Sequence, residues 1–393
     1  MKTIFSAIVS ATILMTILIG CKKQEATNDP LPPQQTLPVP EQVDDGWQTA
    51  RLASVGLKEQ PLIDMLQYID EHSDHAIHSI LIAKEGKLVF EKYYQGYEYL
   101  SNPPGAHGDS ILYSRDEQHY LASVTKSITS ALVGIAINKG FISNLNDSVL
   151  DYLPQYAGIM TGAKAGITLK HLITMTSGLA WDETTYPYGD PRNNVTGLFI
   201  ASDPVRYILQ KSLISDPGTV FFYHSGATNV LAAIVEKTSG KDLAAFAEEN
   251  LFTPLGITEY EWERFNSGIC FASGGLHMKP RDLAKIGYLY LHNGSWGNQQ
   301  LLTQNWIDES QFAWISTPGS PISEAYGYQW WVSRLEVKGA MQSCFLAAGW
   351  GEQFLILLPQ ENLLIQFNCG YFTDPKTVDP LDLVENYILH AVN

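Results

Sequence analysis

A serine and a lysine three positions apart are the residues of this sequence best suited to nucleophilic chemistry. Ser123 and Lys126 lie in the apolar stretch 120–138, whose aliphatic and small residues predict a buried helix. Residues three apart lie on the same face of a helix. A serine on the first turn gains free backbone N–H groups, and a lysine with a lowered pKa can take its proton. The stretch therefore predicts half of a serine acyl-transfer site.

The Ser-x-x-Lys spacing is weak evidence by itself, because about one such pair is expected by chance in a chain of this composition. The alternative is an ordinary amphipathic helix with a capping serine and a solvated lysine. Other segments of the chain must therefore supply the rest of a catalytic site.

A second candidate segment is 217–231, in which a Pro-Gly turn and a short aromatic run lead into a predicted helix. Tyr223 stands where the chain turns, and a phenol there can relay protons between Ser123, Lys126 and a leaving group. A core tyrosine with a hydrogen-bonded hydroxyl is the alternative.

A third candidate segment is the Gly-Trp-Gly sequence formed by Gly349, Trp350 and Gly351 at the end of a predicted strand. Glycine lets a backbone approach a ligand closely, so a backbone N–H here can join that of Ser123 in an oxyanion hole. A bulge or a tight turn between strands is the alternative.

The N-terminal residues predict export and lipid anchoring. Residues 1–20 combine Lys2 with an apolar run too short for a comfortable membrane span, as in a signal peptide. The run ends in 18–21, which resembles a bacterial lipobox and implies cleavage before Cys21 and diacylation of its sulfur. A plain signal peptide or a short anchor helix is the alternative. The Pro-rich segment 21–46 is expected to be a tether that carries the folded domain 47–393 on the outer side of a bacterial membrane.

The net charge, the cysteines and the histidines limit which partners and metals the protein is expected to bind. The net charge of −16 argues against a nucleic-acid partner. Cys270, Cys344 and Cys369 are odd in number and are expected to be buried small hydrophobes. A metal could bind the histidines of segment 70–78, but they span a junction of helix and strand and should not share one face. No metal or cofactor is expected.

Hydrophobic periodicity predicts strands at both ends of the chain and helices between them. Residues 97–119 look irregular. The pattern indicates one sheet built from the two termini, with a helical domain inserted at roughly 140–290. The predicted elements are a helix at 57–71, a hairpin at 77–83 and 87–94, helices within 143–293, strands at 327–335, 341–347, 354–358 and 363–368, and a helix at 381–391.

The three candidate segments together resemble the serine β-lactamase and penicillin-binding superfamily, and within it the class C-like branch that includes esterases and 6-aminohexanoate-dimer hydrolases. Segments 123–126, 223–225 and 349–351 have the order and spacing of its motifs, and flanking blocks such as 172–179 and 273–282 agree. The resemblance covers residue 60 to the end. It implies an α+β, β-lactamase-like fold, with an antiparallel sheet flanked by helices and an inserted all-helical domain.

The resemblance also implies roles for individual residues. Ser123 would be the acylated nucleophile, Lys126 its general base, and Tyr223 the proton shuttle to the leaving group. The N–H groups of Ser123 and of one residue in 349–351 would hold the oxyanion, with Trp350 the expected second donor. The superfamily branch requires no metal.

Two departures from the superfamily pattern affect the expected substrate. Ser225 replaces the usual asparagine of the second motif, and Gly349 to Gly351 replace a Lys-Thr/Ser-Gly motif whose lysine would meet a substrate carboxylate. The sequence therefore favours an ester, a linear amide or a small peptide over a β-lactam. A penicillin-recognising DD-peptidase or β-lactamase, and a non-catalytic ligand-binding lipoprotein, remain alternatives.

Aromatic residues could form an apolar pocket for the acyl group. Tyr186 is the residue expected to contact substrate. The four candidate lining residues are Trp181, Tyr186, Tyr188 and Trp350.

Overall fold

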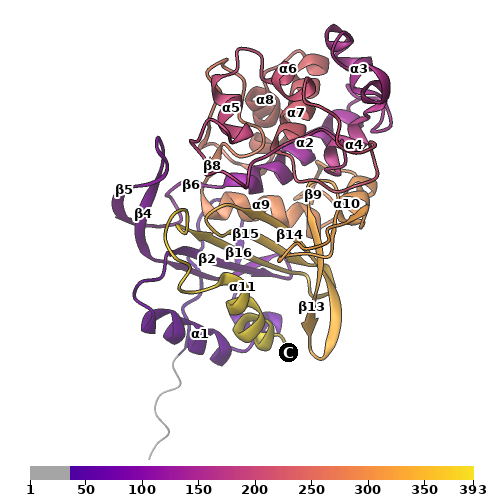
Figure 1. Cartoon of the computed structure of the whole chain (residues 1–393). Helices are drawn as coiled ribbons and strands as arrows, with labels where there is room; N and C mark the ends of the chain where they lie inside the picture. The colour runs from indigo at the N-terminus through magenta and orange to yellow at the C-terminus, as the bar shows by residue number, and fades with distance from the viewer. Residues whose placement is uncertain (1–35) are drawn as a thin grey trace, which may run out of the picture. The chain divides into compact units, whose positions relative to one another are not determined.

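The computed structural model describes residues 36–393, and Leu37–Asn393 form one compact unit (Figure 1). Among these residues the largest sheet has nine strands in the order β1-β3-β2-β16-β15-β14-β13-β12-β11. The strands are β1 (Gln48–Thr49), β2 (Ile77–Lys84), β3 (Lys87–Tyr93), β11 (Ile315–Ser316), β12 (Ala325–Tyr326), β13 (Trp331–Val337), β14 (Ala340–Gly349), β15 (Gln353–Leu358) and β16 (Leu363–Cys369).

The sheet joins the two ends of the folded chain, as the sequence predicted. β2 and β3 form the expected hairpin, and β16 pairs antiparallel to β2 with Phe367 opposite Ile80. Every pairing in this sheet is antiparallel except that of β1 with β3. The antiparallel α+β architecture is confirmed.

One face of the sheet is covered by the first helix and the last helical segment. Helix α1 (Gln60–Glu71) buries Leu62, Met65 and Ile69, which share a core with Ile80 and Ile82 of β2. The last segment runs from α11 (Pro380–Leu383) through a π-helical turn (Val384–Ile388) into α12 (Leu389–Ala391) and contacts α1.

The opposite face carries α9 (Pro280–Leu291), which packs on β15, β16 and β2 (Figure 1). A Cβ at Gly287 would lie 2.5 Å from Leu364 Cδ1, so the glycine lets this helix lie close to the sheet without displacing that side chain. The predicted helical domain at 140–290 included α9, and that boundary is wrong, because α9 belongs to the layer on the sheet.

Most of the remaining helices stack above α9 and form the helical region (Figure 1). Its centre is the packing of α2 on α7, and residues of both belong to the larger of the two principal cores. The helices of this region are α2 (Thr125–Asn138), α3 (Val149–Tyr152), α4 (Leu169–Ile173), α5 (Asn194–Ile200), α6 (Pro204–Leu209), α7 (Ser225–Ser239) and α8 (Leu243–Ala247).

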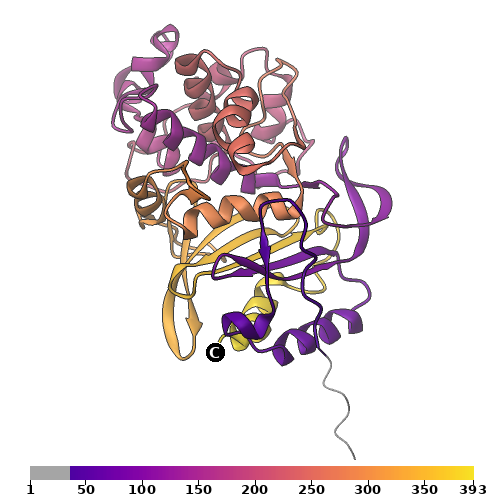
Figure 2. The ribbon, with the colours of Figure 1, turned by 180° about the vertical axis from the view of Figure 1, so that it is seen from behind.

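Residues 97–112 form most of a β-hairpin, where the sequence analysis expected irregular chain. Strand β4 (Gln95–Ser101) pairs antiparallel with β5 (Pro104–Leu112), and the hairpin projects at the side of the molecule (Figure 2). Its strands are largely exposed and polar, so they lack the buried alternation that marks a strand in a sequence. One anchor is Tyr99, whose ring stacks on Tyr120 with centroids 3.9 Å apart.

The compact unit begins at Leu37, nine residues before the predicted end of the tether at residue 46. Asp45 forms a salt bridge of 2.8 Å with Arg281 of α9, and the Trp47 indole donates a hydrogen bond to the Arg281 carbonyl. The predicted signal peptide 1–20, Cys21 and segment 22–35 lie outside the described residues. No helix of residues 36–393 is long and apolar enough to cross a membrane.

The described cysteines are buried, and the histidines of segment 70–78 do not cluster. Cys270, Cys344 and Cys369 are buried free thiols, as expected. The histidines of segment 70–78 do not converge, since His78 lies inside β2 and its ring contacts His119 at 2.8 Å. Within residues 36–393 no group of three or more His, Cys, Asp or Glu side chains is arranged to hold a metal ion.

Candidate active site

The candidate nucleophile lies on a tight turn directly before helix α2. Ser123 belongs to a 3-10 turn (Ala122–Val124), so the α-helix begins at Thr125 and not at residue 120. Ala122 has φ 45°, a conformation that costs a residue with a side chain and often marks functional sites. Ser123 is partly exposed while its neighbours on the turn are buried, so its side chain is open to a ligand.

Lys126 lies directly beside the serine. Its Nζ donates hydrogen bonds of 2.7 Å to Ser123 Oγ and 2.7 Å to the Ser273 carbonyl. No salt bridge to Lys126 exists among residues 36–393. Burial lowers the pKa of the lysine to about 8, although the negative charge of Glu183 partly opposes this shift. A lysine in this state can exist as a neutral amine near physiological pH, as a general base requires.

Tyr223 completes the predicted triad of side chains. Lys126 Nζ lies 5.0 Å from the centre of the Tyr223 ring. Burial raises the pKa of this phenol, and a hydrogen bond with Ser123 partly offsets the rise. The ring stacks on Trp331 of β13 with centroids 5.6 Å apart, which fixes its orientation. The structure thus brings Tyr223 to Ser123 and Lys126, although Tyr223 follows Ser123 by 100 residues in the sequence.

The Gly-Trp-Gly segment lies against the nucleophile turn. Gly349 is the last residue of β14, and a Cβ on it would stand 2.5 Å from the Leu121 carbonyl and 3.1 Å from the Ser123 backbone nitrogen. The glycine therefore permits strand and turn to touch. Gly351 has φ 81°, so it supports the turn into β15. Trp350, between the two glycines, lines the same cavity as Ser123.

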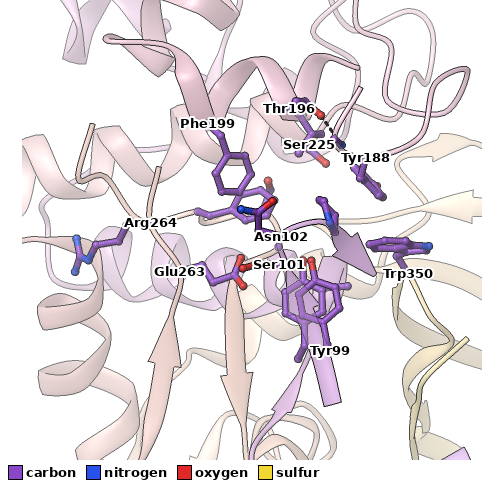
Figure 3. A pocket seen from close by; sticks show the side chains of 18 of the residues that line it. Tyr99, Ser101, Asn102, Tyr188, Thr196, Phe199, Ser225, Glu263, Arg264 and Trp350 are labelled. Carbon is purple, nitrogen blue, oxygen red and sulfur yellow. Dashed lines mark hydrogen bonds between the residues drawn. The ribbon is translucent and has the colours of Figure 1, made fainter. Parts of the chain in front are cut away.

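The cavity beside Ser123 has a volume of about 640 Å³, which suits a small-molecule ligand (Figure 3). Its wall includes Tyr99 and Ser101 of the β4–β5 hairpin, together with Tyr188 and Trp350, whose ring centroids are 4.7 Å apart. The hairpin that the sequence analysis missed is therefore a wall of the pocket.

Two of the predicted pocket aromatics do not line this cavity. Tyr186 packs under the Arg192 guanidinium, 3.9 Å from its ring centre, while its neighbour Tyr188 faces the cavity. Trp181 is buried and stacks on His224 with centroids 4.2 Å apart. Loop conformation decides which of two nearby tyrosines faces inward, and sequence spacing does not reveal it.

The charged residues of the cavity wall are two carboxylates and one guanidinium (Figure 3). Glu261 and Glu263 line the cavity with Arg264. The Arg264 side chain binds Asp242 through two hydrogen bonds of 2.7 and 2.9 Å, so its charge is already paired. No lysine is among the described residues that line the cavity.

Glu183 is a residue of the site that the sequence analysis missed. This buried side chain accepts hydrogen bonds of 2.9 Å from both the backbone N–H and the hydroxyl of Ser225, and another from the Trp181 indole. Ser225 is the residue that replaces the usual asparagine. A glutamate in a polar loop looks like a surface acid, and only the fold shows its contact with a residue 42 positions away.

A comparison with known proteins identifies the family of this chain. Residues 67–379 match the sequence model of the Beta-lactamase family. The chain belongs to the Beta-lactamase family. This match confirms the superfamily that the three motifs resemble.

The sequence identity to individual curated relatives is low. A 6-aminohexanoate-dimer hydrolase of Paenarthrobacter ureafaciens is 28% identical over 207 residues, which cover 50% of this chain and 51% of that protein. The protein flp of Staphylococcus aureus strain N315 is 26% identical over 211 residues, 52% of this chain and 40% of flp. The chain thus spans about half or less of the length of these curated relatives.

A solved structure shares the fold. The crystal structure of a family VIII carboxylesterase superposes with a TM-score of 0.65 at 15% identity, over 84% of this chain and 96% of that one. This likeness confirms the β-lactamase-like fold.

Proposed function

We propose that this protein hydrolyses an ester, a linear amide or a small peptide through an acyl-enzyme formed on Ser123. The observation that carries the proposal is the 2.7 Å contact between Lys126 Nζ and Ser123 Oγ, in a buried site where no residue of 36–393 forms a salt bridge with the lysine. A neutral lysine in hydrogen-bond contact with a serine hydroxyl is the arrangement that proton removal from the nucleophile requires.

The proposed reaction proceeds in two halves. The Ser123 proton moves to Lys126 as Oγ attacks the substrate carbonyl carbon. The backbone N–H groups of Ser123 and Trp350 hold the oxyanion, and Tyr223 passes the proton from Lys126 to the leaving group. Water then attacks the acyl-enzyme, and the same groups act in reverse to release the acid and restore the Ser123 hydroxyl.

The charges of the cavity support a substrate that does not depend on a carboxylate for binding. Its one cationic lining residue among those described, Arg264, is paired with Asp242, while Glu261 and Glu263 add negative charge. A carboxylate such as that of penicillins would meet no free cation there. The names of relatives that act on esters and on a linear amide dimer are consistent with this substrate class.

Covalent labelling tests the serine hydrolase assignment. A fluorophosphonate probe should label the wild-type protein, and Ser123→Ala should abolish both labelling and ester turnover. A thermal melt establishes that the variant is folded. Labelling that persists in folded Ser123→Ala would contradict the proposal, and an unreactive wild type would favour the non-catalytic ligand-binding alternative.

A substrate panel tests the substrate class. We expect p-nitrophenyl esters and short linear amides to be turned over faster than nitrocefin. Nitrocefin turnover that rivals the best ester would instead favour the β-lactamase or DD-peptidase alternative.

We further propose that the mature protein is anchored by a lipid on Cys21, on the outer side of a bacterial membrane. The lipobox-like end of the apolar run at 18–21 supports this proposal. In a bacterial host, the wild-type protein should partition into the detergent phase, and Cys21→Ser should move it to the aqueous phase. Equal partitioning of the two would contradict lipidation at this residue.

A further inference from the structure

Two loops and the start of helix α7 are connected to Lys126 by one continuous set of hydrogen bonds. At one end, Ser225 is held by the Glu183 carboxylate through two bonds of 2.9 Å. The Ser225 carbonyl accepts a bond of 3.0 Å from the Asn229 amide, which also donates to Ser273 Oγ at 2.9 Å. The Ser273 carbonyl accepts the 2.7 Å bond from Lys126.

Each member of this network is buried, so few other partners are available. Glu183 is 6% exposed, and Ser225, Asn229 and Ser273 are 3%, 3% and 1% exposed. Both the nitrogen and the oxygen of the Asn229 side chain form hydrogen bonds, since its Oδ1 also accepts the Ala272 N–H at 2.9 Å. A buried group that loses such a partner pays a desolvation cost, so the network favours a single arrangement.

The hydrogen bonds received by Glu183 are those of a carboxylate. Oε2 accepts from the Trp181 indole and the Ser225 backbone N–H, and Oε1 accepts from the Ser225 hydroxyl. Within residues 36–393 no cation forms a salt bridge with it. A buried carboxylate without a paired cation is costly unless a nearby group carries the opposite charge.

Lys126 can supply that opposite charge, because it becomes an ammonium when it takes the Ser123 proton. Its pKa is sensitive to the Glu183 charge, which raises it against the effect of burial. Glu183 therefore stabilises the protonated lysine, which is the form created as Ser123 attacks.

The other titratable groups near this pair are three tyrosines and a histidine, which are neutral at neutral pH, and one lysine. Burial raises the pKa values of the three tyrosines and lowers that of the histidine to about 3, so all four are neutral. Lys211 is partly exposed, and its Nζ lies 5.9 Å from the centre of the Trp181 ring. These groups are Tyr188, Lys211, Tyr223, His224 and Tyr326.

We propose that Glu183 is a positioning residue for the proposed acyl transfer: it fixes the Ser225–Asn229–Ser273 network that holds Lys126, and it balances the ammonium formed on Lys126. The proposal rests on the proposed function. The proposal also explains why a serine stands at position 225 in place of asparagine, because the serine hydroxyl and backbone N–H each donate a hydrogen bond to one of the two carboxylate oxygens.

The decisive measurement is kcat/KM against pH for a p-nitrophenyl ester. The activity of the wild type should rise with pH as Lys126 loses its proton. Glu183→Gln removes a negative charge, which lowers the Lys126 pKa, so the acid limb should move to lower pH by about half a unit or more. The plateau of kcat/KM should fall roughly ten- to hundredfold, because the network is disturbed.

Two variants serve as controls. Glu183→Asp keeps the charge and should leave the acid limb in place even though its plateau falls. Asp182→Asn removes the adjacent carboxylate of the same loop, whose hydrogen-bond partners within residues 36–393 are the backbone N–H groups of Thr184 and Thr185, and should leave both limb and plateau unchanged. An acid limb that stays fixed in Glu183→Gln, or that moves equally in Asp182→Asn, overturns the proposal.

The outcomes separate this inference from the proposed function. If Ser123→Ala retains turnover, the proposed function fails; if it is inactive while Glu183→Gln keeps the wild-type profile, only the role of Glu183 fails. Should Glu183→Gln not fold, Ser225→Ala tests the network without changing charge. An at least fivefold loss of kcat/KM with an unmoved limb supports the proposal, and an unchanged kcat/KM overturns it.

Discussion

Two of the lysines buried within residues 36–393 follow the same i, i+3 spacing from a polar residue. Lys126 follows Ser123, and Lys285 of α9 follows Asp282. Their exposed fractions are 2% and 1%. Lys285 forms a 2.7 Å salt bridge with Asp282, whereas Lys126 contacts only a hydroxyl and a carbonyl through its hydrogen bonds.

The difference shows how one spacing serves two purposes. A carboxylate in direct contact favours the charged form of a lysine, and the pair then stabilises structure only as long as both partners are present. A hydroxyl and a carbonyl leave burial to dominate, which makes proton exchange possible. The identity of the residue three positions earlier therefore separates the candidate general base from the structural ion pair.

The largest expected effect distinguishes the two lysines by activity. Lys126→Met should slow acylation by about 10²–10⁴-fold, because the general base is lost. Lys285→Met should leave kcat/KM per folded molecule unchanged. Stopped-flow release of p-nitrophenol measures both. Comparable losses in the two variants would break the distinction.

The next effect distinguishes them by stability. Lys285→Met leaves Asp282 buried without its partner and should lower the free energy of unfolding by about 3–5 kcal/mol. The double variant Asp282→Leu/Lys285→Met should recover most of that loss, since an apolar pair needs no charge compensation. Urea unfolding followed by circular dichroism is the measurement. A single variant as stable as the wild type would show that the salt bridge contributes little.

The smallest effect concerns pH. Burial lowers the Lys126 pKa to about 8, so its ammonium, the inactive form, predominates below that pH. The value of kcat/KM should fall about tenfold per pH unit below pH 8 and level off above it. Lys285→Met should show the same profile. A profile that is flat between pH 6 and 8 would contradict the assignment of Lys126 as the base.

The sequence predicted the features that depend on local order. Ser123 and Lys126 are close because three residues span one helical turn, and the hairpin of β2 and β3 follows from a short turn between two apolar runs. The motif order was enough to place the chain in its superfamily and to predict its fold. These inferences need no knowledge of how distant loops pack.

The features that the sequence did not reveal depend on contacts between distant segments. Glu183 reaches Ser225 only because the loop after α4 folds over the start of α7, and Tyr188 replaces Tyr186 in the cavity for the same reason. The β4–β5 hairpin lacks a buried face, so it gave no periodic signal. The end of the tether was misplaced because polar residues such as Asp45 pair with Arg281, 236 positions away.

The pairing of β2 with β16 has a consequence for biosynthesis. Ile80 and Phe367 are neighbours in the middle of the sheet, although 287 residues separate them in the sequence. The ribosome makes β2 long before its partner exists, so the edge of β2 stays unpaired until almost the whole chain has emerged. Pairings of such long range form slowly and expose apolar strands in the meantime. We therefore expect this chain to depend on chaperones during its synthesis.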